Sequence, residues 1–114
     1  LDKIKRSQAP IIFGDGSQIR DFIYVGDIVM ANFLAMKSEV NNLLVNIGTG
    51  QPLTILELAE IFIKISNLKL KPIFKNALDG DIKKSQANIE LATCSFNWKP
   101  KKMLNEWLTE IIKK

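Results

Sequence analysis

The sequence predicts a mixed α/β fold built from helices and short strands. Two patterns favour this class: short β-prone runs bounded by glycine turns, and helical segments with apolar residues three and four positions apart. A hydrophobic content of 46% and a charged content of 25% over 114 residues are typical of a folded protein. Strands and helices do not alternate strictly, and so small a chain buries a limited share of its surface. We therefore expect the fold to be incomplete on its own.

The N-terminal third of the sequence predicts two β-prone segments and a helix. Ile11–Phe13 is a short strand that runs into the turn Gly14–Gly16, where glycines supply positive φ angles. Phe22–Val25 is a second β-prone run. Asp27 can then cap a helix over Ile28–Lys37, because its carboxylate accepts hydrogen bonds from unpaired amides. The apolar face of this helix is formed by Ile28, Ala31, Leu34 and Ala35.

The middle of the chain predicts a buried strand and a capped helix. Leu43–Ile47 is an almost continuous apolar run that ends at glycines, as in a strand covered on both faces. Thr54 and Glu57 have the spacing of a capping box, and Leu53 is the apolar residue expected just before it. A helix over Ile55–Ser66 follows. It is predicted to bury Leu58, Ile61, Phe62 and Ile65.

The C-terminal part predicts one more strand and two more helices. Lys71–Lys75 is the strand, and Asn76–Asn88 has little periodicity apart from an Asp-Gly-Asp turn signal. Ile89–Phe96 is a short helix, Trp98–Pro100 a break, and Met103–Ile112 an amphipathic helix. The inward residues of the last helix are Leu104, Trp107, Leu108 and Ile111, and Trp98 is expected to be a packing residue.

Composition excludes several classes of function. Cys94 is the single cysteine and there is no histidine, so we expect neither a disulfide nor a metal site, and Cys94 itself is expected to pack as a small hydrophobic residue. No apolar run approaches the ~20 residues of a membrane span, which favours a cytoplasmic protein that does not bind membranes. The net charge of +4 favours phosphate-bearing ligands, and without an aromatic-basic stripe we expect no nucleic-acid binding.

Several polar residues could carry a function. The Arg20 guanidinium is permanently charged and presents a planar fork that matches two phosphate oxygens; the alternative is an ion pair with adjacent Asp21 or another acid. Asn46 lies in an apolar run and must find hydrogen-bond partners, either in the following turn or in a ligand. Asp79 and Asp81 are, from the residues alone, a solvated turn.

Four segments in order resemble motifs of the extended short-chain dehydrogenase/reductase family, which includes NAD-dependent nucleotide-sugar epimerases and dehydratases. The segment 14–27 resembles G-D-G-x-Q-x-R-D-F-x-Y-V-x-D, and 45–50 resembles F-N-I-G-T-G. The segment 80–88 resembles G-D-x-x-x-S-x-A-D, and 96–100 resembles L-G-W-x-P. The similarity is greatest to UDP-glucose and UDP-N-acetylglucosamine 4-epimerases. It implies the C-terminal part of a Rossmann-type fold.

The resemblance assigns roles in binding a UDP-sugar or another nucleotide-sugar. It implies that Arg20 contacts the diphosphate and that Asp81 accepts hydrogen bonds from the ribose hydroxyls. It implies that the backbone of Ile11 and Phe13 meets the edge of the base, and that Asn46 reaches the nucleotide. Where the family often has a second phosphate-binding arginine the chain has Leu78, and Asn88 replaces the aspartate of A-D, so Arg20 would carry more of the binding, with Lys83 or Lys84 as possible supplements.

Two motifs of the family do not occur in the sequence: the G-x-x-G-x-x-G of the dinucleotide loop and the catalytic Y-x-x-x-K. We therefore predict that residues 1–114 form a substrate-side portion, that they hold no catalytic residue, and that NAD is bound in the parent enzyme mainly by a part absent here. Turnover and tight NAD binding by this chain are not expected. The alternatives are a stand-alone nucleotide-sugar-binding module, part of a dehydratase, or a remnant without function; the parent family is often homodimeric.

Overall fold

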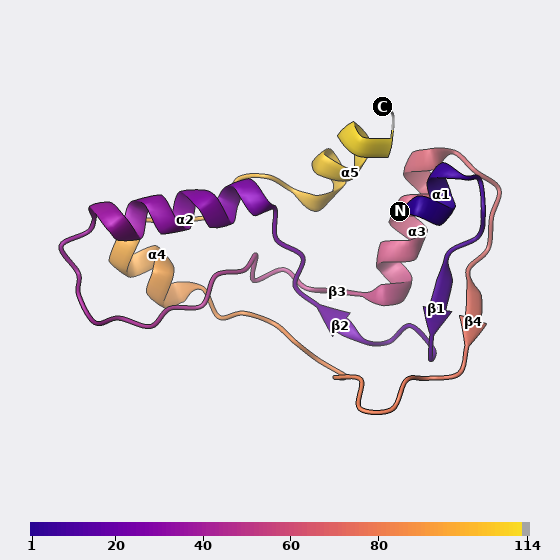
Figure 1. The fold of residues 1–114 in the computed structure, drawn as a ribbon, viewed down its shortest axis with the longest axis horizontal. Coiled ribbons are helices and arrows are strands. Elements are labelled where there is room, and N and C mark those ends of the chain that lie inside the picture. The colour runs from indigo at the N-terminus through magenta and orange to yellow at the C-terminus, as the bar shows by residue number, and fades with distance from the viewer. Residues whose placement is uncertain (113–114) are drawn as a thin grey trace.

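Two lobes joined by a narrow middle make up the protein (Figure 1). The computed structural model describes residues 1–112. The elements are α1 (Asp2–Lys5), β1 (Ile11–Phe13), β2 (Ile19–Arg20), α2 (Val25–Lys37), β3 (Leu53–Thr54), α3 (Ile55–Ser66), β4 (Ile73–Lys75), α4 (Glu90–Phe96) and α5 (Leu104–Ile112). One lobe holds α2 packed on α4, and the other holds α1, α3, β1 and β4, with α5 against α3. The predicted mixed α/β class is confirmed.

The strands form two small sheets. β1 and β4 pair in parallel, with Ile12 opposite Phe74, whereas β2 and β3 pair antiparallel, with Arg20 opposite Leu53. The segment Asn76–Asn88, whose sequence has little periodicity, also contacts β2 of the second sheet, because the Ile19 amide donates to the Lys83 carbonyl at 2.9 Å. Residues from opposite ends of the sequence therefore meet around β2.

The core of the first lobe is built around Trp98. Its indole is 1% exposed and lies with Ala31 and Ala92, and its Nε1–H donates to the Asp27 carbonyl at 3.0 Å. The partly buried residues around this group are Ile23, Leu34, Val45, Ile47, Ile89 and Phe96. The packing role expected of Trp98 is confirmed. In the second lobe the buried side chains are Ile4, Ile12 and Ala59, and Leu108 is buried on α5.

The capping box of α3 is present as predicted. The Glu57 amide donates to the Thr54 hydroxyl at 3.1 Å, and the Thr54 amide donates to the Glu57 carboxylate at 2.7 Å. The helix then runs to Ser66 and ends at Asn67 in the left-handed conformation. The residues predicted to line its inner face are half-buried, and Ala59 is the member of the helix that is fully buried.

Asp27 does not cap a helix, and this prediction is wrong. α2 begins earlier, at Val25, because the Tyr24 carbonyl accepts hydrogen bonds from the amides of Asp27 and Ile28. The Asp27 side chain instead reaches across the fold, where Oδ2 accepts from the amides of Lys101 and Lys102 at 3.1 and 3.0 Å. It is buried and fixes the segment that precedes α5 to the first turn of α2.

Two predicted strands are not formed. Phe22–Val25 has no strand pairing, because its last residue already belongs to α2. Leu43–Ile47 is irregular: Val45 and Ile47 pack against the Trp98 group, whereas Leu44 is 92% exposed. A strand needs a neighbour for its amides, and within residues 1–112 none pairs with this run.

Cys94 is exposed, so its predicted packing role is wrong. Ala92 and Phe96 lie one helical turn apart and face the core, while Cys94, midway between them, points to the opposite side of α4.

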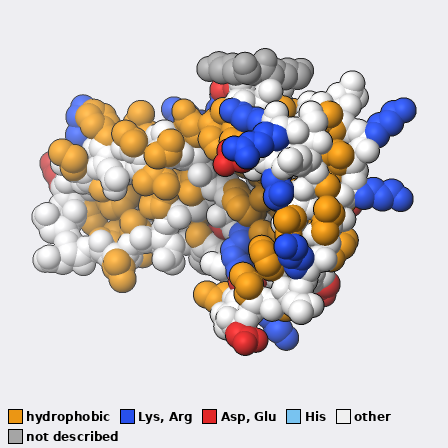
Figure 2. All heavy atoms as spheres, turned by 45° about the vertical axis from the view of Figure 1, so that its right-hand side comes forward, with side chains coloured by type: hydrophobic (Ala, Val, Ile, Leu, Met, Phe, Trp, Pro, Cys, Tyr) orange, Lys and Arg blue, Asp and Glu red, His pale blue; other side chains and the backbone are white. Residues whose placement is uncertain are grey.

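The chain is flat and elongated, with extents of 51 × 35 × 17 Å and a radius of gyration of 16.7 Å. A self-contained domain of this length has a radius of about 13 Å. Apolar side chains are spread over the surface of the lobe that holds α2 (Figure 2). On α2 the most exposed large ones are Val25, Val29 and Met36, at 65%, 62% and 84%. These features agree with the expectation of an incomplete fold.

Candidate functional site

Two of the predicted site residues, Arg20 and Asp81, form an ion pair. The Arg20 Nη2 lies 2.6 Å from Asp81 Oδ1, and the two side chains are 27% and 31% exposed. Arg20 Nη1 donates to the carbonyls of Ile19 and Ile82 at 2.8 and 2.5 Å. The guanidinium is thus held by three partners but remains accessible. The alternative expected for Arg20 from the residues alone, an ion pair with Asp21 or another acid, is therefore formed, and the acid is Asp81. The roles that the resemblance implied for Arg20 and Asp81 did not include a contact between the two.

Gln18 joins this pair to β1. Its Nε2 donates to the Phe13 carbonyl at 2.7 Å and to Asp81 Oδ2 at 3.1 Å. We refer to Phe13, Gln18, Arg20, Asp81 and Ile82 as the Arg20 cluster. It brings together Phe13, Arg20 and Asp81, three of the five predicted site residues, although Asp81 follows Arg20 by 61 positions in the sequence. Gln18 was not predicted as a site residue, although it is the glutamine of the first motif.

The other two predicted site residues lie outside these contacts. Ile11 is half-buried in β1, and its neighbour Pro10 accepts a backbone hydrogen bond from Ile73 at 2.9 Å. Asn46 is exposed and does not tie down the Gly48–Gly50 turn. The ligand roles of all five residues stay predictions.

Asp21 holds the Gly48–Gly50 turn instead. Arg20 and Asp21 are adjacent in sequence, but their side chains contact different partners. Asp21 Oδ1 accepts from the Thr49 amide at 2.9 Å and from the Thr49 hydroxyl, and Oδ2 accepts from the amides of Gly50 and Ala87 at 3.0 and 3.4 Å. A β-carbon at Gly48 would lie 2.6 Å from Asp21 Oδ2, so this approach requires glycine. Sequence reasoning missed this role of Asp21, although Asp21 is the aspartate that follows the arginine in the first motif.

The turn amides are therefore occupied by a side-chain carboxylate. Burial acts to raise the pKa of Asp21, but the hydrogen bonds from Thr49, Gly50 and Ala87 together outweigh it and hold the pKa below its ordinary value of 3.8. The folded protein thus favours the ionised form. The stabilisation that results is present above pH 3.8 and is lost as the pH falls through the lowered pKa.

We expect the stabilisation by the ionised Asp21 carboxylate to be measurable as a pH-dependent difference in the free energy of unfolding between the wild type and the Asp21→Asn variant. The free energy of unfolding of the wild type should exceed that of the variant by a constant amount at neutral pH. The difference should shrink as the pH falls from 3.8 through the lowered pKa, because only below that pKa is Asp21 of the wild type neutral in the folded as well as the unfolded state. Urea unfolding at a series of pH values measures it. A difference that persists unchanged at the most acidic pH would contradict the prediction.

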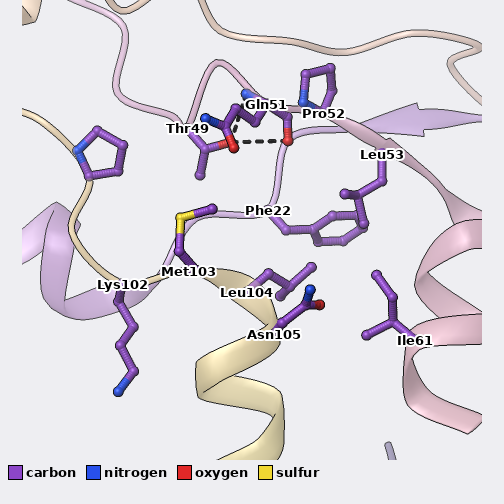
Figure 3. Close-up of a pocket in the computed structure, with 11 residues that line it drawn as sticks. Phe22, Thr49, Gln51, Pro52, Leu53, Ile61, Lys102, Met103, Leu104 and Asn105 are labelled. Carbon is purple, nitrogen blue, oxygen red and sulfur yellow. Dashed lines mark hydrogen bonds between the residues drawn. The ribbon is translucent and has the colours of Figure 1, made fainter. Parts of the chain in front are cut away.

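Several hollows lie near these residues. An open hollow of about 440 Å³ is lined by Phe13, Lys75, Asn76, Ala77 and Leu78, and so adjoins the Arg20 cluster through Phe13. A more enclosed cavity of about 310 Å³ lies between the β3 region, α3 and the start of α5. In it, Phe22, Leu53, Ile61 and Leu104 face one another (Figure 3). None of the five predicted site residues lines this second cavity.

Residues 1–112 contain no cluster of three or more acidic, cysteine or histidine side chains placed to bind a metal ion. No helix in this part of the chain is both long enough and apolar enough to cross a membrane.

Comparison with known proteins confirms the resemblance to the family. The sequence model of the NAD dependent epimerase/dehydratase family matches residues 1–48. Over 112 residues the chain is 37% identical to a putative UDP-glucose 4-epimerase of Methanocaldococcus jannaschii. The alignment covers 98% of this chain and 36% of the relative. The chain thus spans about a third of the length of the relative.

Solved structures give the same result for the fold. The UDP-glucose 4-epimerase of Thermotoga maritima, in a structure with UDP-glucose, is 35% identical with a TM-score of 0.91, over 98% of this chain and 36% of that one. The UDP-glucuronic acid 4-epimerase of Bacillus cereus, in complex with UDP-glucuronic acid and NAD, is 29% identical with a TM-score of 0.85, over 96% and 38%. The structural relatives therefore include NAD-bound epimerases.

Proposed function

Since the chain matches the NAD-dependent epimerase/dehydratase family in both sequence and fold, we propose that it is the nucleotide-sugar-binding portion of a UDP-sugar 4-epimerase. In this proposal Arg20 holds the diphosphate and Asp81 accepts from the ribose hydroxyls. The base lies against β1, next to the open hollow at Phe13, and Asn46 lies near the nucleotide. The role of this portion is to orient the substrate, which lowers the entropic part of the barrier.

The Arg20 cluster is the observation that carries the proposal. An accessible guanidinium and a carboxylate stand side by side at the end of β2. Lys75, which is paired with Phe13 in the other sheet, supplies a further positive charge beside the hollow. A diphosphate needs charge-assisted donors in a fork, and a ribose needs an acceptor. Relatives whose structures hold UDP-glucose or UDP-glucuronic acid support the choice of ligand.

The residues present do not fit NAD. A dinucleotide cradle needs a glycine-rich loop that leads from a strand into a helix N-terminus. Here the glycine turn after β1 leads to β2, a strand. The N-terminus of α3 is already capped by Thr54 and Glu57. In this proposal the residues of this chain take no part in hydride transfer, and the cofactor is bound by the remainder of the parent enzyme.

The test is binding of UDP, and we expect Arg20→Ala to lower the affinity at least tenfold. The variant removes charge-assisted hydrogen bonds, each of which contributes about 1.5–3 kcal/mol. Calorimetric titration with UDP, UDP-glucose and NAD measures it, with Arg6→Ala as a control that removes an exposed arginine outside the cluster. Equal UDP affinity in the wild type and Arg20→Ala would overturn the proposal.

A stand-alone module without catalysis is a second candidate, because the Arg20 cluster lies entirely within this chain. Saturable UDP binding by a monodisperse, cooperatively unfolding chain would favour it. A portion of a nucleotide-sugar dehydratase stays an alternative to the epimerase. The cytoplasmic location and a homodimeric parent remain predictions from the sequence.

A further inference from the structure

Gln18 is a residue of the Arg20 cluster to which the motifs assign no role. Its Nε2 donates to two acceptors, the Phe13 carbonyl and the Asp81 carboxylate. These partners fix the orientation of the amide, because the reversed amide would place an oxygen against two oxygens. Gln18 therefore links β1 to Asp81 by one donor group.

The surrounding chain is shaped to admit this amide. A β-carbon at Gly14 would lie 3.0 Å from Gln18 Nε2, and the Gly14 φ of +81° is one that other residues resist. Gln18 Oε1 is buried and has no hydrogen-bond partner within residues 1–112. An unpartnered buried oxygen is unfavourable, so a glutamine at this position calls for an explanation beyond packing.

The two oxygens of the Asp81 carboxylate have different partners, and this division indicates what Gln18 does. Arg20 Nη2 donates one of its two N–H groups to Asp81 Oδ1, so a diphosphate that takes up both N–H groups of Nη2 displaces this carboxylate oxygen. The second oxygen, Asp81 Oδ2, is held by Gln18 and not by Arg20. The carboxylate thus has an anchor that does not depend on the guanidinium.

We propose that Gln18 is a positioning residue that keeps Asp81 in place while Arg20 exchanges the carboxylate for a diphosphate. Asp81 Oδ1, released by Arg20, then accepts from a ribose hydroxyl. This inference rests on the proposed function. It adds that the Arg20–Asp81 pair is the ligand-free state of the site, and that Gln18 couples recognition of the diphosphate to recognition of the ribose.

The test compares the affinities for UDP and 2′-deoxy-UDP. In the wild type the missing hydroxyl should cost about tenfold in affinity, the size of one hydrogen bond to a charged group. In Gln18→Leu this preference should fall to about one, while part of the UDP affinity survives through Arg20. Gln86→Leu is the matched control, because Gln86 is a glutamine outside the cluster whose side chain donates to the Gly50 carbonyl at 3.4 Å. A preference retained in Gln18→Leu would overturn the inference.

A ligand-free measurement separates this inference from the proposed function. The guanidinium N–H signals of Arg20 should be resolved and slow to exchange with solvent in the NMR spectrum of the wild type. They should broaden in Gln18→Leu and in Gln18→Glu, a variant of the same shape that loses the donor and repels Asp81; thermal melting confirms that each variant is folded. Signals unchanged in both variants would overturn the role of Gln18. If no chain binds UDP, the proposed function fails, and these signals alone decide whether Gln18 positions Asp81.

Discussion

Replacing Trp98 with alanine should lower the free energy of unfolding by about 3–5 kcal/mol, the range for a large aromatic residue removed from a core. The indole is 1% exposed and lies at the centre of the group formed with Ala31 and Ala92. The substitution also removes the Nε1–H donor of the Asp27 carbonyl. Domains are stable by only about 5–15 kcal/mol, so this loss should remove a large part of the stability of the protein. Urea unfolding followed by circular dichroism measures the loss.

Trp107→Ala is the matched control, since it removes the same side chain from a half-buried position on α5. Its ring is 6.3 Å from that of Tyr24 and contributes less buried area. We expect the control to lose less than half as much stability. Equal losses in the two variants would mean that the Trp98 group is not the centre of the core.

Asp27→Ala should destabilise the protein by about 2–4 kcal/mol. Its Oδ2 accepts from two backbone amides in a buried position, and their loss of a partner costs about 1–3 kcal/mol for each donor that water does not reach. The connection between α2 and the segment before α5 would be broken. Chemical unfolding measures the loss, and amide hydrogen exchange at Lys101 and Lys102 should accelerate in the same variant.

Asp27→Asn separates the contribution of the hydrogen bonds from that of the charge. An asparagine oxygen accepts from the same amides in the same geometry, so most of the stability and the slow exchange should return. If Asn and Ala variants lose equal stability, the two amides are not what Asp27 stabilises.

Local patterns predicted the local structure well. The strand at Ile11–Phe13 and the helix at Ile55–Ser66 were predicted because turn glycines and a capping box act within a few residues. The family motifs placed Phe13, Arg20 and Asp81 among the site residues, and these three do meet. Whether they bind a nucleotide is for the UDP titration to decide.

Contacts between distant segments could not be predicted from the sequence. Asp27 is of a residue type that often caps helices, yet its side chain binds amides 74 and 75 residues away in the sequence. The sequence left open whether Arg20 pairs with adjacent Asp21 or with another acid, and in the fold Arg20 pairs with Asp81 while Asp21 contacts Thr49. Leu43–Ile47 is apolar enough for a strand, but the pairing neighbour that a strand requires is not a property of the run itself.

The tie between Asp27 and the segment before α5 has a consequence for the synthesis of the protein. The ribosome produces the chain from the N-terminus, so α2 emerges long before its partners at Lys101 and Lys102. During that interval the carboxylate must stay hydrated, and the lobe that contains Trp98 cannot close. The nascent chain therefore displays the apolar residues of α2 to chaperones and proteases until nearly all the described residues have been translated.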